Sequence, residues 1–509
     1  MAGKIIHIIG DHNLIPNIVK QYMDMGENPL MFSSIEEHSG QDIPDEMVIA
    51  TSLGSSTSPM SEDIRNTAFI SDLLAGHKSE RHVRIHFFTH TPDIMLLMQT
   101  WDLDKDLQHK AEIFPFSSES LWAAKITGAD MSSDSKFPTL DREPISLGSD
   151  KCVHLVLSGM NPMSQEIAKH AALTCHFPNY TRDHRLRTRI TMLDPDMDKF
   201  MDSFISRHEH LFANSYHRYI DLGSEGESLV KTLHRPQYNG KREDYVDIEW
   251  EFVKGEMNSK VLRDKIDLWA SSPKQILTIV FCHEDEAANI ESAIKLPSGI
   301  GENEVPVLIR AKNPSMLQVL SSRKMPGIIP FGTKDCTYDI TLPIVRMAKA
   351  INHAYNCCYH DNCPPADIEM GAAEESWRSL SNAKKWSNIY SAMTVGTKMR
   401  SLGYTSQDWS TLYSISQKDI EILAEVEHNR WSVEELLLGY RPADDMEQKA
   451  IEEDIAKKKD YREKFVHYDL RAYSDLRCDS TGKQATIYDI AICSALPLIA
   501  NTFKKGGRA

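Results

Sequence analysis

Hydrophobic runs alternate with amphipathic stretches over the first 140 residues. A β-branched run at residues 4–9 ends at Gly10, and apolar residues then recur at helical spacing from Leu14 to Tyr22. Later apolar runs of strand length lie at residues 47–51, 83–88 and 112–115. Strands that alternate with helical patterns are typical of a parallel sheet covered by helices. The pattern therefore predicts an α/β unit over residues 1–145.

The same alternation restarts at residue 151. Strand-like runs lie at residues 151–158, 189–193, 275–281, 305–309 and 327–329. Helical patterns lie at residues 164–173, 287–294 and 314–320. Residues 223–260 are polar and charged and contain the turn signal Asn239-Gly240, so we interpret them as an insertion. A second α/β unit is expected over residues 146–345.

The chain becomes mostly helical after about Leu342. This pattern predicts a helical connector over residues 346–415 and a mainly α-helical domain over residues 416–509. Within that domain, residues 444–465 form a charged stretch that is typical of a solvated helix face. The predicted fold class is therefore α/β: two tandem Rossmann-like, doubly wound parallel-sheet domains followed by a mainly α-helical domain.

The turn after the first strand of the second unit is a candidate anion site, because unpaired backbone N–H groups point outward where a strand meets a helix N-terminus. Gly159 occupies the first glycine position of the dinucleotide fingerprint, Asn161 tolerates positive φ, and Ser164 is small. Asp194, at the end of the next strand, stands where a carboxylate would accept hydrogen bonds from ribose hydroxyls. These residues predict a bound nucleotide. The alternative is a Rossmann unit that has kept its fold without a ligand.

Two further anion signals are weaker. In the first unit only Gly10 matches the fingerprint, and Asp11 puts a carboxylate where a pyrophosphate would lie. Residues 182–189 contain four arginines just before the strand that ends in Asp194. Since arginine suits bidentate phosphate recognition, Arg187 and Arg189 are predicted phosphate contacts. The alternative is ion pairing with nearby aspartates.

Motifs for metal binding and catalysis are weak. Cys357, Cys358, His360 and Cys363 lie close together, but structural zinc usually needs a second ligand pair, so we expect no metal. No GxSxG, HExxH or P-loop motif occurs, and no catalytic residue is predicted. The polar run at residues 283–286 follows a strand and offers the acid or base that an enzyme would need.

Composition narrows the class of partner. The formal net charge of −16 argues against binding to a nucleic-acid duplex, which depends on dense Lys/Arg surfaces. The best apolar run, residues 490–500, is shorter than the roughly 20 residues that span a bilayer, so no membrane insertion is expected. The first ten residues read as a strand rather than a signal peptide. A cytoplasmic protein with reduced cysteines is predicted.

The second unit resembles the TrkA-N family, the Rossmann-type regulatory domain of potassium transport systems. The resemblance covers residues 151–333 and rests on VHLVLSGMNPMS, ITMLDPD, CHEDEAANIESAI and VPVLIRA. It implies binding of NAD(H) or another adenine nucleotide, coupled to a conformational change. It also implies a homo-oligomer, because TrkA-N domains are typically dimers or higher assemblies.

The C-terminal third resembles the RyR domain, the repeat first named from ryanodine receptors. The matching residues are EHNRW at 427–431, LLLGY ending at Tyr440, VHYDLRAYSDL at 466–476, and Tyr488-Asp489. Tyr440 stands where Trp is common in the family, and Tyr468 where Pro is common. The resemblance implies adenine-nucleotide binding, with candidate contacts at Glu427, Arg430, Trp431, Tyr440 and His467. The alternative is that Trp431 only anchors a helical core.

The leading hypothesis is a nucleotide-sensing regulatory protein that signals by conformational change or assembly. By analogy of architecture it would serve ion-transport regulation or antiviral defence signalling. Because the chain carries no predicted membrane pore, its output would pass to a separately encoded membrane channel or effector. A nicotinamide- or nucleotide-dependent enzyme and a ligand-free scaffold for protein interactions remain the alternatives.

Overall fold

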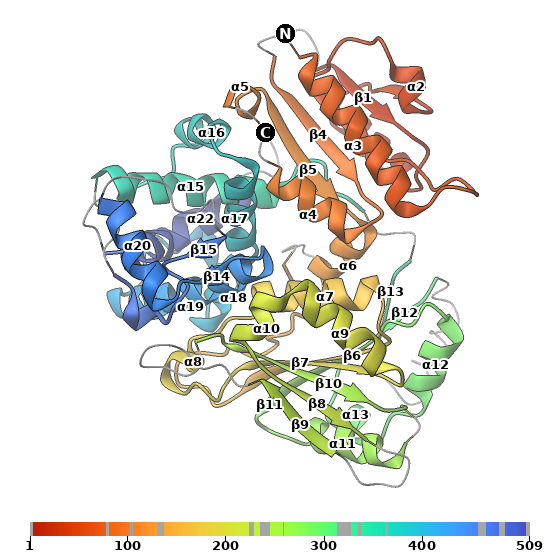
Figure 1. The fold of residues 1–509 in the computed structure, drawn as a ribbon, viewed down its shortest axis with the longest axis vertical. Coiled ribbons are helices and arrows are strands. Elements are labelled where there is room, and N and C mark those ends of the chain that lie inside the picture. The colour runs from red at the N-terminus through yellow and green to blue at the C-terminus, as the bar shows by residue number, and fades with distance from the viewer. Residues whose placement is uncertain are drawn as a thin grey trace.

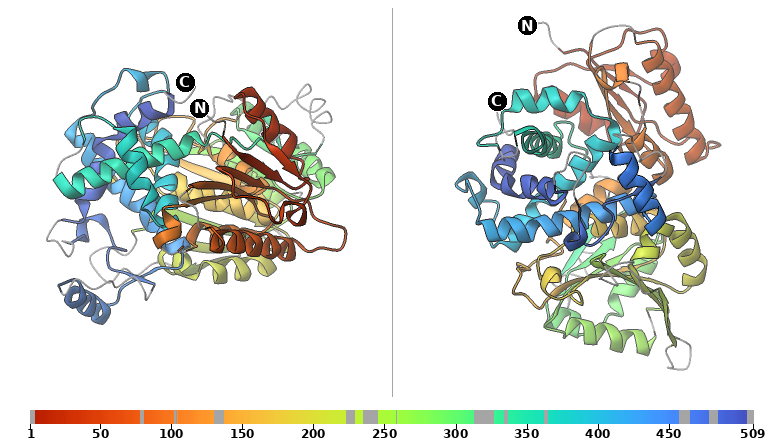
Figure 2. Two further views of the ribbon diagram at one scale, coloured as in Figure 1. Left: turned by 90° about the horizontal axis from the view of Figure 1, so that it is seen from above. Right: turned by 60° about the vertical axis from the view of Figure 1, so that its left-hand side comes forward.

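The computed structural model contains two α/β units and a helical unit that lies against both of them (Figures 1 and 2). It describes residues 4–77, 81–101, 103, 105–129, 137–222, 229–234, 245–257, 259–312, 327–333, 337–361, 365–456, 465–477 and 484–504. The helix predicted at residues 314–320, Cys363 and much of the charged stretch at 444–465 lie outside the described residues.

The first α/β unit is built on a parallel five-stranded sheet of order β2-β1-β3-β4-β5. Its strands are β1 (Ile6–Ile9), β2 (Leu30–Phe32), β3 (Glu46–Ile49), β4 (Val83–Phe88) and β5 (Ala111–Phe116). Its helices are α1 (Ile15–Asp24), α2 (Ile35–His38), α3 (Pro59–Ala75), α4 (Pro92–Thr100), α5 (Lys105–Gln108) and α6 (Ser118–Thr127). This order is one of the two common doubly wound arrangements, with its topological switch point between β1 and β3.

The two faces of this sheet are covered by different parts of the chain. One face packs against Ile70 and Leu74 of α3 and Met98 of α4. The other packs against α1 and against Tyr338 and Ile340, which follow the second unit in sequence. Residues 337–342, which we call the return segment, therefore bring the chain back to the first unit.

The second α/β unit has an eight-stranded sheet of order β13-β12-β11-β6-β7-β10-β8-β9, in which β9 alone runs antiparallel to its neighbour. The strands are β6 (Cys152–Ser158), β7 (Thr188–Asp194), β8 (Tyr216–Asp221), β9 (Leu229–His234), β10 (Ile248–Lys254), β11 (Gln275–Phe281), β12 (Val307–Arg310) and β13 (Ile328–Phe331). The helices are α7 (Pro162–Thr174), α8 (Asn179–Arg182), α9 (Met197–Arg207), α10 (Glu209–Asn214), α11 (Lys260–Ala270), α12 (Glu286–Ile294) and α13 (Gly299–Glu302). With β10 as the third strand, the six strands from β10 to the edge strand β13 follow the Rossmann order 3-2-1-4-5-6.

The expected insertion at residues 223–260 belongs in part to this sheet. It contains β10, which pairs in parallel with β7 on one side and β8 on the other. Its residues alternate apolar and acidic, and its glutamates are buried because Glu249 pairs with Arg189 and Glu251 with Arg218. The acidic positions made a central strand look like a polar surface segment.

The helical unit comprises α15 (Pro343–Asp361), α16 (Met370–Arg378), α17 (Asn382–Met393), α18 (Val395–Ser401), η1 (Asp408–Ser410), α19 (Gln417–Leu437), β14 (Arg441–Pro442), α20 (Asp445–Ala456), β15 (Val466–His467), η3 (Tyr473–Asp475), α21 (Thr486–Ser494) and α22 (Leu496–Lys504). The predicted connector and the predicted C-terminal domain share one core, since Trp377 and Met399 pack in the same cluster as Leu423 and Leu496. They form a single packed unit.

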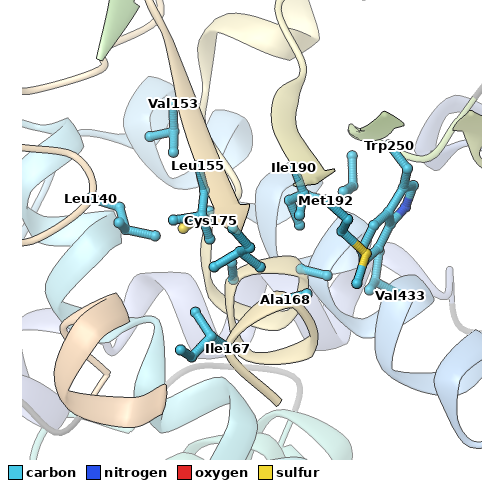
Figure 3. Packing of buried hydrophobic residues seen from close by; sticks show 14 of the residues in the cluster. Leu140, Val153, Leu155, Ile167, Ala168, Cys175, Ile190, Met192, Trp250 and Val433 are labelled. Carbon is cyan, nitrogen blue, oxygen red and sulfur yellow. The ribbon is translucent and has the colours of Figure 1, made fainter. Parts of the chain in front are cut away.

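Helix α19 joins the helical unit to the second α/β unit. It begins at its N-cap residue Ser416, whose Oγ accepts a hydrogen bond of 3.1 Å from the Asp419 N–H. Val433 and Leu436, near its other end, belong to the main core of the second unit, together with Trp250 (Figure 3). Burial of this apolar face holds α19 on the sheet's helical layer.

Within the described part of the chain, no single helix has the length and hydropathy to cross a membrane. The bent pair Thr486–Ser494 and Leu496–Phe503 passes that test only when its two helices are taken together.

Candidate ligand-binding sites

The crevice of the second unit lies between the turns that follow β6 and β11. Gly159 adopts φ +90°, and a Cβ built on it would lie 2.8 Å from the His283 ring and 2.9 Å from the His283 backbone nitrogen. The Ser158 Oγ lies 3.2 Å from His283 Nε2. A glycine is therefore required here by positive φ and by the close approach of the neighbouring turn.

The predicted anion-binding turn satisfies its own backbone. Gly159 N–H donates to the Leu193 carbonyl (3.0 Å), and Asn161 N–H donates to Ser164 Oγ (3.0 Å). Asn161 Oδ1 caps α7 by accepting from Met163 N–H (3.0 Å) and Ser164 N–H (3.3 Å). A pyrophosphate bound here would have to displace these bonds, because Pro162 adds no N–H.

Asp194 completes this self-satisfied turn. Its Oδ2 accepts from the Met160 N–H at 2.9 Å and its Oδ1 from the Asp196 N–H at 2.8 Å, and its side chain is buried. The structure thus brings Gly159, Asn161, Ser164 and Asp194 together at the carboxyl ends of β6 and β7. The Asp194 carboxylate faces the backbone of this turn.

Gly10 occupies the switch point of the other sheet. Its φ is +115°, and a built Cβ would lie 2.2 Å from the Ala50 carbonyl oxygen. Asp11 Oδ1 accepts from the Ser52 N–H at 2.8 Å, so the carboxylate ties the turn after β1 to the loop after β3. The glycine is needed for close packing of the two turns.

Arg187 and Arg189 do not reach the crevice. They lie just before and at the start of β7, whereas Asp194 ends that strand, a separation of roughly 17 Å at about 3.3 Å per residue. Arg189 pairs with Glu249, and the Arg187 Nε donates to the Val246 carbonyl at 3.4 Å. Both arginines lie at the amino end of β7, which is the end of the sheet opposite to Asp194.

His154 of β6 lies next to Arg189 at the same end of the sheet. It predicts that the stability of the protein depends on pH. Its Nδ1 is 2.9 Å from Gln275 Oε1 and its Nε2 is 2.8 Å from Thr191 Oγ1. Burial, and then the charge of Arg189, lower the pKa of His154 to about 4. The unfolded chain therefore takes up the proton first, near pH 6.5, and stability is lost as the pH falls from there toward 4.

The H154Q variant keeps a polar side chain at this position but has no group that titrates there. When the pH falls from 7 to 5, we predict that its free energy of unfolding decreases by about 2 kcal/mol less than that of the wild type. Urea unfolding at both pH values measures this difference. Identical losses in the two proteins would show that His154 does not titrate with a lowered pKa.

The residues suggested by the RyR resemblance separate into two groups. Trp431, Tyr440 and His467 converge into what we call the aromatic cluster: the His467 ring is 4.7 Å from Trp431 and 6.2 Å from Tyr440. Pairing of β14 with β15 brings Tyr440 and His467 near each other across 26 residues. Trp431 and Tyr440 stay partly exposed, while His467 is buried.

Glu427 and Arg430 lie in a buried ion network with Lys398 and Glu434. Arg430 donates to Glu427 at 3.0 Å and to Glu434 at 2.5 Å, and Lys398 pairs with Glu427. Each of these side chains is at most 2% exposed. A ligand at the aromatic cluster would not contact this network without opening the core.

The remaining polar candidates have structural partners. Asp285 caps α12 by accepting from the Ala287 N–H at 3.0 Å, and Glu284 is exposed. Cys357 lies 3.6 Å from His353, and the Cys358 thiol donates to the Ile487 carbonyl. No cluster of three or more potential metal ligands occurs among the described residues.

A cavity of about 860 Å³, the central cavity, lies where the three units meet. The first unit contributes residues of α4, β5 and α6, the second unit contributes His170, and the helical unit contributes residues of α17, α18, η1 and α22. Its aromatic lining residues are Phe114, Phe116, Phe137, Tyr338, Trp386, Tyr390, Trp409 and Phe503. Its volume is in the range of small-molecule sites, which often lie between domains.

Two buried polar atoms belong to residues that line this cavity and have no hydrogen-bond partner among the described residues. They are Nδ1 of His170 and Nε1 of Trp409, and each residue is only 5% exposed. Buried polar groups are nearly always hydrogen-bonded, so an unpaired one needs an explanation. Both atoms are themselves inaccessible to solvent, so a ligand in the cavity would reach them only if the two side chains turned toward it.

Sequence reasoning missed the central cavity because its walls come from segments more than 300 residues apart. Met95 and Phe503, for example, line the same space. In its local sequence, each lining residue looks like an ordinary buried residue of a helix or strand.

No protein-family model, curated protein or solved structure matches this chain.

Proposed function

We propose that this protein is a nucleotide-sensing regulatory protein whose ligand binds in the central cavity. The observation that carries the proposal is that one large aromatic cavity is lined by all three units. A ligand that contacts several units stabilises the arrangement in which those contacts exist together, and this is the basis of a conformational switch.

Polar contacts across the cavity would transmit such a change. Arg400 of α18 donates two hydrogen bonds of 2.9 Å to Asp141, which lies between the two α/β units in sequence. Tyr390 of α17 donates to Gln99 of α4 at 2.9 Å. Arg400, Tyr390 and Gln99 all line the cavity, so a ligand there competes with or reinforces the contacts that join the units.

The lining suits a purine nucleotide. Partly exposed Trp386 and Tyr390 offer rings on which a base can stack. Lys125 supplies positive charge for a phosphate, whereas the charge of Arg400 is already paired with Asp141. The Rossmann crevice is the less favoured site, because the N–H groups of its turn are already bonded.

A thermal-shift screen against NAD⁺, NADH, ATP, ADP, ADP-ribose and cyclic oligonucleotides tests the proposal. A ligand at 100 times its Kd should stabilise the protein by about 2.7 kcal/mol. We predict that the A124W variant, which fills the cavity from α6, abolishes this shift. A75W is the matched control, since Ala75 is exposed at the end of α3.

The outcomes separate the hypotheses. Loss of the shift in W431A but not in A124W would contradict the central cavity and favour the aromatic cluster. Turnover of a nucleotide that depends on His283 would favour the enzyme. No shift with any member of the panel would contradict nucleotide sensing and favour a scaffold.

A further inference from the structure

A second cavity, of about 460 Å³, lies between the first α/β unit and the helical unit, and we call it the cationic cavity. Arg84 of β4 and Arg346 and Lys349 of α15 line it. Exposed Thr341 and Gly371 lie at its rim, whereas Lys349 is buried within it. The cavity is therefore open to a solute and deep enough to remove charges from water.

Cations outnumber carboxylates around this cavity. Lys385 of α17, 3% exposed, is not part of the lining, but its charge interacts with those of Glu112, Lys349 and Glu374. The carboxylates are Glu374, 2.6 Å from Lys349, and Glu112, 3.3 Å from Arg84. In the lining itself, three cations against one carboxylate, Glu374, leave an excess of two positive charges, in a protein whose formal net charge is −16.

Part of this positive charge is without a partner. The Nζ of Lys385 and the Nε of Arg346 are buried and have no hydrogen-bond partner within the described part of the chain. Arg346 also forms no ion pair with a described residue, unlike Arg84 and Lys349. An anion bound at the partly exposed Arg346 would give its guanidinium the charge partner that Arg84 and Lys349 already have.

We propose that the cationic cavity binds the phosphate groups of a small polyanion, a diphosphate in its simplest form. Guanidinium groups bind phosphate oxygens in a bidentate fashion, and a partly buried lysine adds a point charge. The volume exceeds what a single phosphate ion requires, which favours a diphosphate or a phosphorylated metabolite. This site is separate from the turns of both Rossmann-like sheets and from the aromatic cluster.

The cationic cavity and the central cavity share a wall. Leu342 and Val345 line both of them. An anion held by Arg346 and Lys349 would therefore bias the position of the first turns of α15, which also border the central cavity. The phosphate site is in a position to tune the response to a ligand bound next to it.

Calorimetric titration of the full chain with pyrophosphate tests the proposal, with inorganic phosphate and ADP as further arms. We expect R346Q to weaken pyrophosphate binding by about 10- to 100-fold, because one charge-assisted contact is lost. R185Q is the matched control: it removes the same charge from a side chain that is 89% exposed, and its affinity should equal that of the wild type. Arg346 has no described ion-pair partner, so R346Q leaves no carboxylate unpaired.

Each outcome decides a point. Binding of pyrophosphate that persists in A124W but weakens in R346Q supports this site whatever the fate of the nucleotide proposal. Equal affinity for phosphate would identify free phosphate as the ligand, and tighter binding of ADP would identify a phosphorylated metabolite. Failure of pyrophosphate to bind, or equal weakening in R346Q and R185Q, would overturn the proposal.

Discussion

The E427Q variant should lose about 3–5 kcal/mol of unfolding free energy. Glu427 accepts from Arg430 at 3.0 Å and pairs with Lys398, and all three side chains are at most 2% exposed. Although burial alone would raise it, the charges of Arg430 and then Lys398 hold the pKa of Glu427 at about 2. In the wild type, Glu427 and Glu434 balance the buried cations Lys398 and Arg430. The amide of the variant removes one of these negative charges, so one buried cation is left without a counter-charge or solvent.

Urea unfolding at pH 7 measures this cost. E421Q is the matched control, since Glu421 lies on the same helix, is exposed, and should change stability by no more than about 0.5 kcal/mol. A loss below about 1 kcal/mol in E427Q would show that the network is hydrated or rearranges. The result also bears on the RyR-like motif, because it assigns Glu427 and Arg430 to the fold and leaves Trp431 for a ligand.

The Y338A variant should lose about 3–5 kcal/mol, the usual cost of truncating a buried aromatic side chain to alanine. Tyr338 stacks on Phe116 with ring centroids 3.7 Å apart, and its hydroxyl lies 2.8 Å from His86 Nδ1. It is 5% exposed and lies in the return segment, so the substitution also loosens one wall of the central cavity.

Two substitutions separate the effects at this position. Y338F keeps the stacking and loses only the hydroxyl contact with His86, so it should lose about 1–3 kcal/mol. Y413A removes the same group from a side chain that is 73% exposed and should be close to neutral. If Y338A is no less stable than Y413A, the return segment does not contribute to the first unit's core.

The local hydrophobic pattern predicted most of the parallel strands. The run at residues 83–88 coincides with β4, and the run at 112–115 lies within β5. These strands are buried on both faces, so each appears as a continuous apolar run. β2 was missed because Leu30 and Met31 are exposed on a three-residue edge strand, and β10 because its glutamates meet arginines of neighbouring strands.

The sequence predicted the positions of the candidate turns but not the hydrogen bonds that their backbone groups make. Gly159 and Asp194 do meet at the carboxyl ends of β6 and β7, because these two strands are neighbours in the sheet. Whether the turn's N–H groups remain free depends on side-chain orientation, and Asp194 and Asn161 use them. Of the five residues predicted as one binding set, Trp431, Tyr440 and His467 lie together, whereas Glu427 and Arg430 belong to the buried ion network.

The sequence by itself determined the two parallel α/β units, the helical C-terminal third and the glycines at both switch points. These properties depend on periodicity and on turn chemistry, which act between residues close in the chain. Only the tertiary structure decided that the connector and C-terminal segment form one core, that Arg189 faces away from the crevice, and that two cavities lie between the units. Those features depend on contacts such as Tyr338 with Phe116 and Arg400 with Asp141, between residues that lie more than 200 positions apart and whose local sequence carries no record of the partner.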